Sequence, residues 1–87
     1  MKECMILEDD MKKIYKQIGQ NVKRLRAENG SISQLALALA IGHKAVGTVS
    51  MAEICTNNKH FNIEHIIKIA NVLECEISDF FKGINYK

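Results

Sequence analysis

The sequence predicts a compact all-α domain of five short helices, and three observations support this fold class. The chain has 87 residues, which is enough for one domain with one modest core. Hydrophobic residues make up 47% of the chain, a proportion typical of a globular protein rather than a disordered one. There is no proline and little alternation of β-branched residues, so strands have little support, while apolar residues recur at helical spacing.

The first helix is predicted over about residues 11–28. Asp10 is its expected N-cap, and Asn29-Gly30 is its expected end, with glycine in the left-handed conformation. Apolar side chains share one face of this helix, and basic and amide side chains share the other. The apolar face comprises Met11, Ile14, Ile18, Val22 and Leu25.

The second helix is expected to start at a cap formed by Ser31 or Ser33 and to run through Ala40, with Gly42 ending it. Its leucines and alanines surround the helix axis on all sides, which is typical of a buried helix. The alternation of leucine and alanine also suits a strand, but both residues favour helices over strands.

The last three helices follow at short intervals. The third is expected from about residue 44 or 45 to Cys55, with Gly47 as a weak point. Asn62 caps a fourth helix over Ile63–Leu73. Its predicted buried stripe comprises Ile63, Ile66, Ile67, Ala70 and Leu73.

The fifth element is a turn or more of helix, and the features that predict it lie close together in the sequence. Ser78 is its expected cap, Phe80 and Phe81 are expected to pack inward, and Gly83 ends it. The whole chain then divides into an acidic segment over residues 1–10, whose order the sequence leaves open, a helical domain over 11–83 and a tail over 84–87.

Charge is unevenly distributed along the chain. The net charge is +2, but residues 1–10 contain four acidic residues and one lysine, a local balance of −3, so the remainder carries +5. Six of the twelve basic residues fall between Lys12 and Arg26. Such a cluster suits phosphate groups, and it also suits an ordinary solvated helix face.

Several classes of protein are disfavoured. The three cysteines form no Cys-x-x-Cys pair and the histidines are scattered, so we expect free thiols, no metal and no cofactor. No apolar run approaches the roughly 20 residues of a membrane span, and the acidic N-terminus does not resemble a signal peptide. We therefore expect a cytoplasmic protein. No glycine-rich phosphate loop or nucleophile with a base is present, so we expect no enzyme, and no small-molecule effector is indicated.

Five motifs nevertheless follow one another in a recognisable order. They are Ile18–Gly30, Ile32–Gly42, Val49–Glu53, Ile63–Leu73 and Ile77–Phe81. In this order they resemble the five helices of the lambda-repressor-like (Xre/Cro-type) helix-turn-helix family, over about residues 14–81. The resemblance implies a helix-turn-helix over about 33–55 and a bacterial or phage transcription regulator of the repressor or controller type. It also implies a homodimer that binds double-stranded DNA with the third helix in the major groove.

The resemblance also assigns roles to particular residues. It implies a structural ion pair between Arg26 and Glu53. The expected base-facing residues are Ala45, Val46, Gly47, Ser50 and Met51. The expected phosphate-binding residues are Gln34, Lys44, Thr48, Asn57, Asn58 and Lys59. We expect the dimer interface to use the last helix and the tail, through Ile77, Phe80, Phe81 and Ile84.

The expected base-facing residues are unusually apolar. Arg, Gln and Asn discriminate bases by paired hydrogen bonds, whereas valine, glycine and methionine can offer only contact with a thymine methyl group. The sequence therefore predicts binding dominated by phosphate contacts and DNA shape. The alternative is a helix-turn-helix scaffold that serves as a protein-interaction module with little or no DNA readout. Its contact patch would comprise Ala45, Val46, Val49 and Met51.

Overall fold

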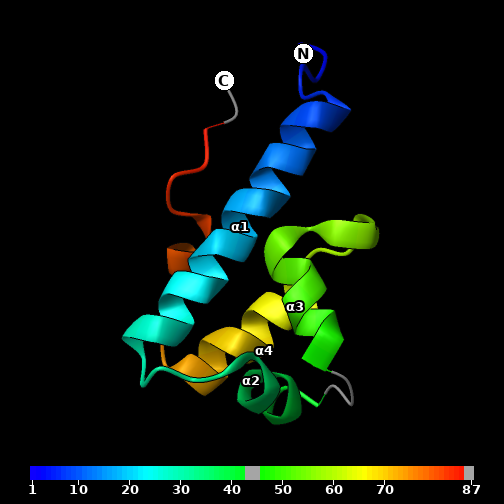
Figure 1. Ribbon diagram of the computed structural model, residues 1–87. Helices are drawn as coiled ribbons and strands as arrows, with labels where there is room; N and C mark the ends of the chain where they lie inside the picture. The colour runs from blue at the N-terminus through cyan, green and yellow to red at the C-terminus, as the bar shows by residue number, and fades with distance from the viewer. Residues whose placement is uncertain (43–45, 86–87) are drawn as a thin grey trace.

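The computed structural model describes residues 1–42 and 46–85. Of Val46 it describes the backbone only. These residues form four α-helices and two short 3₁₀-helices (Figure 1). The elements are α1 Glu8–Glu28, α2 Gln34–Ala40, α3 Val46–Ile54, η1 Thr56–Asn58, α4 Ile63–Leu73 and η2 Ile77–Phe81. No strand occurs in these ranges, so the predicted all-α class is confirmed.

The predicted count of five α-helices is not reproduced, because the last element is a 3₁₀-helix. η2 has only five residues between Glu76 and Lys82, both of which have extended backbone. So short a segment barely closes one α-turn, and the tighter 3₁₀ spacing is common in such pieces. The predicted cap at Ser78 is wrong, because Glu76 precedes the first residue of η2.

α1 begins three residues earlier than predicted. Its N-cap is Leu7, so the predicted N-cap at Asp10 is wrong. Asp10 lies instead in the first turn, where its carboxylate accepts the Leu7 backbone N–H at 2.9 Å. Three acidic residues share this turn and suit the positive end of the helix dipole. The predicted end is confirmed, since Asn29 is the C-cap and Gly30 has a φ of +96°.

α2 is capped as predicted but is not buried as predicted. The Ser33 hydroxyl accepts the Ala36 N–H at 3.0 Å. Of its leucines, Leu37 is fully buried, whereas Leu35 and Leu39 are 52% and 61% exposed. The helix packs against α3 and α4, and among the described residues the side that carries Leu35 and Leu39 faces solvent.

α4 carries its buried stripe on a face rotated from the predicted one. The Asn62 cap is confirmed, since its side chain accepts the His65 N–H at 2.8 Å. Ile63 and Ile67, which were expected in the core, are 74% and 51% exposed. The buried residues of this helix are Ile66, Ile69, Ala70 and Leu73.

The core lies between α1 and the other helices. The apolar face of α1 contributes Ile18, Val22 and Leu25 to it, as predicted. Gly19 allows α1 to approach α3 closely, because a Cβ atom there would clash with the carbonyl oxygen of Glu53. The backbones of these two helices therefore meet at a position where only glycine fits.

Candidate functional site

A buried carboxylate joins the helices of the predicted helix-turn-helix. Glu53, near the end of α3, is only 3% exposed. It accepts Arg26 Nε at 2.7 Å and Nη2 at 2.9 Å, so the expected pair is present in bidentate form. Gln34 Nε2 at the start of α2 donates to the same carboxylate at 2.9 Å. One charged group thereby fixes α1, α2 and α3 relative to one another.

This network changes the role available to Gln34. The side chain was expected to bind a phosphate group, but its amide nitrogen already donates to Glu53. Arg26 is committed in the same way, because its Nη1 donates to the backbone oxygen of Ile32 at 2.8 Å. Both side chains therefore position the helices in the structure.

α3 presents one partly exposed side along its described residues. Gly47, Ser50 and Met51 recur at helical spacing and are partly exposed, as is Thr48. Val49 is 1% exposed and belongs to the core, so it cannot form part of the apolar contact patch of the alternative prediction. Lys44 and Ala45 lie outside the described residues, as does the side chain of Val46.

The loop after α3 holds three expected phosphate-binding residues at the surface. Asn57, Asn58 and Lys59 are all exposed. Asn57 and Asn58 have φ values of +53° and +57°, a left-handed conformation that asparagine tolerates better than most residues. The Asn57 amide also reaches Met51 Sδ at 3.4 Å, which links the loop to α3.

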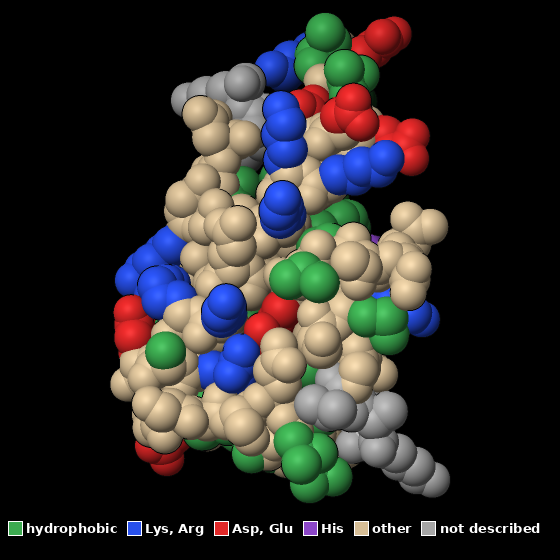
Figure 2. Space-filling view, viewed as in Figure 1, with side chains coloured by type: hydrophobic (Ala, Val, Ile, Leu, Met, Phe, Trp, Pro, Cys, Tyr) green, Lys and Arg blue, Asp and Glu red, His purple; other side chains and the backbone are tan. Residues whose placement is uncertain are grey.

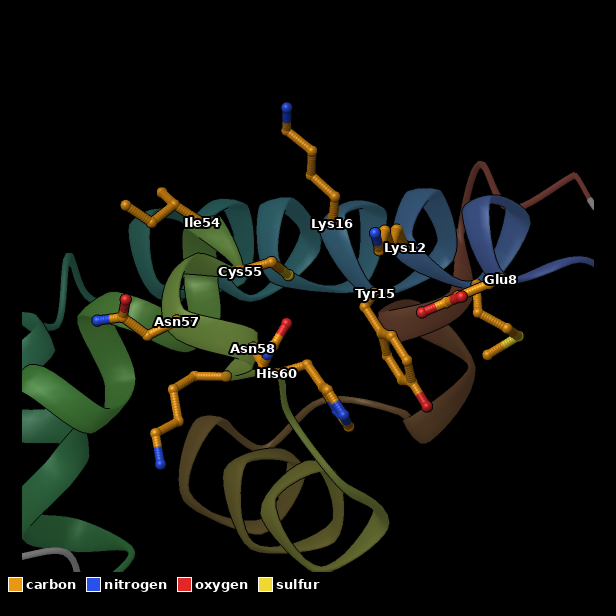
Figure 3. Close-up of a pocket in the computed structure, with 11 residues that line it drawn as sticks. Glu8, Lys12, Tyr15, Lys16, Ile54, Cys55, Asn57, Asn58 and His60 are labelled. Carbon is orange, nitrogen blue, oxygen red and sulfur yellow. The ribbon is translucent and has the colours of Figure 1, made fainter.

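This loop faces the N-terminal half of α1 across a cavity of about 610 Å³ (Figure 3). Tyr15 and His60 point toward each other there, with stacked rings whose centroids are 3.7 Å apart. Burial raises the pKa of the Cys55 thiol in the wall of this cavity, and the Lys16 charge partly opposes that rise. No motif in the sequence predicted this cavity, although the basic cluster between Lys12 and Arg26 was one signal of it.

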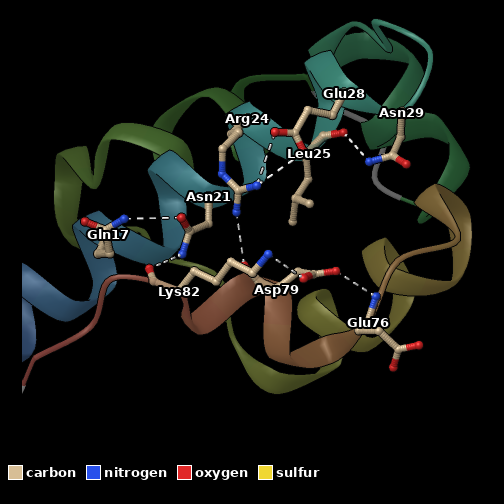
Figure 4. Close-up of polar contacts among 9 residues, drawn as sticks. All are labelled: Gln17, Asn21, Arg24, Leu25, Glu28, Asn29, Glu76, Asp79 and Lys82. Carbon is tan, nitrogen blue, oxygen red and sulfur yellow. Dashed lines mark hydrogen bonds and ion pairs between the residues drawn. The ribbon is translucent and has the colours of Figure 1, made fainter.

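The C-terminal segment is tied to α1 by a second buried polar side chain (Figure 4). Asn21 Nδ2 donates to the backbone oxygens of Phe80 at 2.8 Å and Lys82 at 2.9 Å. Gln17 Nε2 donates in turn to Asn21 Oδ1 at 3.2 Å. Arg24 adds a bond to the backbone oxygen of Asp79. This segment therefore belongs to the folded core rather than to a loose tail.

The expected dimer residues differ in what they expose. Phe80 has no exposed surface and packs within the core of its own chain, so the structure does not present it to a partner. Ile77 and Phe81 are each more than two-fifths exposed. Ile84 is partly buried against the core. Of these four expected dimer residues, Ile77 and Phe81 are the two that offer a substantial apolar surface.

Charged side chains on the visible face gather along α1 (Figure 2). Lysine and arginine side chains run from its N-terminal end to the part beside α3, and several carboxylates gather near the N-terminus. Within residues 1–42 and 46–85, no three His, Cys, Asp or Glu side chains come together as a metal site would require. No helix in the same ranges has the length and apolar character to cross a membrane.

α2 packs on α3, and α3 packs on α1, as in a helix-turn-helix protein. The resemblance to the lambda-repressor-like type is confirmed by a solved structure. The chain is similar to the restriction-modification controller protein C.AhdI from Aeromonas hydrophila. The two share 27% sequence identity and superpose with a TM-score of 0.65, over 77% of this chain and 96% of that one. No protein-family model matches the chain, and no curated protein matches it either.

Proposed function

We propose that the chain is a DNA-binding transcription regulator of the controller type, acting as a homodimer. The observation that carries this proposal is the match to C.AhdI, because it spans 96% of that controller. α3 would enter the major groove, with Gly47, Ser50 and Met51 facing the bases. Asn57, Asn58 and Lys59 would contact phosphates, and these contacts would provide most of the affinity.

The polar network around Glu53 supports this use of the helices. A recognition helix discriminates between sites only if its angle to the rest of the protein is fixed. The Arg26–Glu53–Gln34 contacts tie the start of α2 to the end of α3, with all three donor–acceptor distances at or below 2.9 Å. The helix pair is thereby preorganised for docking before any DNA is bound.

The homodimer is proposed on the exposed apolar surface of η2. Ile77 and Phe81 provide it, and the bonds of Asn21 to Phe80 and Lys82 hold the segment in place. Two α3 helices in such a dimer would meet half-sites about 34 Å apart, one turn of DNA.

The test is fluorescence anisotropy with a duplex from the region upstream of the gene and a scrambled duplex, at several salt concentrations. We expect tighter binding to the upstream duplex and a steep loss of affinity as salt rises. K59Q should weaken binding to both duplexes, whereas K68Q, which removes an α4 lysine paired with Glu64, should not. Absence of binding by the unaltered protein at low salt would overturn the proposal.

A second candidate, a protein-interaction module, is favoured by the outer face of α2. Leu35 and Leu39 lie exposed one turn apart on this face, and neighbouring exposed apolar side chains can form a contact surface for another protein. Binding through such a surface would respond little to salt. The same salt series therefore separates the two functions.

A further inference from the structure

The cavity between α1 and the loop after α3 is lined by three lysines from two separate parts of the chain. Lys12 and Lys16 lie one turn apart on α1, and Lys59 follows η1. Among the described residues, Arg24, Lys68 and Lys82 each pair with an acidic side chain, but none of these three lysines does. Glu8 is the one acidic residue in the wall. The cavity thus carries an excess of uncompensated positive charge.

The frame of the cavity is built from packed groups. The Tyr15–His60 stack joins α1 to the loop, with ring planes only 12° from parallel. Asn58 projects between the end of α3 and His60, where its amide can donate to a bound oxygen (Figure 3). Lys12 and Lys16 project from neighbouring turns of α1, and Lys16 extends outward into solvent (Figure 3). Lys59 is exposed on the loop. The arrangement suits a phosphate group that approaches from outside.

The position of the cavity relative to α3 indicates which phosphate it would receive. α3 has nine residues and is therefore about 13 Å long. The major groove is about 12 Å wide, so the ends of a helix that crosses it lie near the sugar-phosphate backbones. Ile54 and Cys55, at the C-terminal end of α3, form part of the cavity wall. The cavity therefore lies where a backbone strand would pass.

We infer that this cavity receives a backbone phosphate of duplex DNA, held by Lys12, Lys16 and Lys59. The inference rests on the proposed function and adds the N-terminal half of α1 to the DNA-binding surface. Glu8 lies in the same wall and opposes the phosphate by its charge. Removal of that charge should therefore strengthen binding.

The experiment compares K12Q/K16Q with the matched double variant K13Q/K68Q. Lys13 lies on the other side of α1, beside Gly83 and Ile84, and Lys68 pairs with Glu64 on α4. K12Q/K16Q should weaken binding to the upstream and scrambled duplexes alike, by roughly tenfold. For K12Q/K16Q, the slope of the logarithm of the binding constant against the logarithm of the salt concentration should be shallower by about 1. K13Q/K68Q should leave both quantities close to those of the unaltered protein, and E8Q should bind more tightly.

Methylphosphonate replacement of single phosphates in the duplex locates the contact. One flanking position should weaken the unaltered protein more than K12Q/K16Q, because that variant keeps only Lys59 of the three proposed partners. If the unaltered protein binds with normal salt dependence and the two double variants behave alike, this inference is wrong and the proposed function stands. If the unaltered protein binds no DNA, both are wrong.

Discussion

Glu53 and Asn21 are equally buried, at 3% exposure each, yet they hold the molecule together in different ways. Glu53 is a carboxylate that gathers Arg26 and Gln34 around the helix-turn-helix. Asn21 is a neutral amide that reaches across to two backbone oxygens of the C-terminal segment. A buried charge is costly when one partner is lost, whereas a buried amide costs only its unmet hydrogen bonds. The helix-turn-helix is therefore the more sensitive of the two regions.

The largest effect is expected from R26A. It leaves the Glu53 carboxylate buried with only the Gln34 amide, and loss of one partner from a buried pair typically costs about 3–5 kcal/mol. Urea unfolding followed by circular dichroism measures the change. The double variant R26A/E53Q should recover part of the loss, because the buried charge is gone. A double variant no more stable than R26A would show that charge is not the reason.

G19A is expected to come next, because it disturbs the same region through the backbone. The new Cβ would clash with the Glu53 carbonyl oxygen, so α1 and α3 must move apart. Overpacking of this kind costs about 1–3 kcal/mol, and here it also displaces the carboxylate network. The matched control is G47A, whose Cβ would meet only Met51 Cε at 3.8 Å. Thermal unfolding should show G19A destabilised and G47A unchanged or slightly stabilised.

N21A tests the other region. It leaves the Phe80 and Lys82 oxygens without their side-chain donor, at an expected cost of about 1–3 kcal/mol. Sedimentation should also show a weaker dimer if η2 forms the interface, because the segment loses its anchor. R26A, by contrast, should change DNA affinity more than dimerisation. If N21A and R26A changed dimerisation and DNA affinity equally, the proposed difference between the C-terminal segment and the helix-turn-helix would be wrong.

The smallest effect is expected from D79N at the edge of the C-terminal segment. The Lys82 ammonium, at 3.2 Å, and the Glu76 backbone N–H hold the pKa of Asp79 below its ordinary value of 3.8. A lowered pKa in the folded state contributes stability above the unfolded value and loses it as the pH falls through the folded one. The D79N deficit should therefore be small near pH 7 and should shrink below pH 3.8. A deficit that grows in acid would contradict this assignment.

Local signals in the sequence correctly predicted several caps and ends of helices, although the caps at Asp10 and Ser78 were wrong. Ser33, Asn62 and Gly30 each act within a few residues of their own position, so the surrounding fold hardly alters their effect. Asp10 was misplaced by one turn because a carboxylate in the first turn suits a helix as well as one at the cap. Assignment of the buried face was less successful on α2 and α4.

Burial depends on what lies beside a helix, and composition cannot supply that. α2 is apolar all round, but its neighbours cover one side, so Leu35 and Leu39 remain in solvent. Ile63 and Ile67 are also left outside although they match the period of the helix. Gly19 carries no pattern in the sequence, and its importance follows only from the approach of Glu53.

The sequence by itself determined the helical class and the order of the motifs, because spacing and local capping carry that information. The Arg26–Glu53 pair was expected only from the resemblance to the lambda-repressor-like family, since its two residues lie far apart in the chain. Tertiary structure alone decided that Gln34 donates to Glu53, that Phe80 is internal and that Lys12, Lys16 and Lys59 surround one cavity. Each of these depends on contacts between residues more than a dozen positions apart or on the burial they produce. Such contacts are set by how the helices pack, and helix packing is a property of the whole chain.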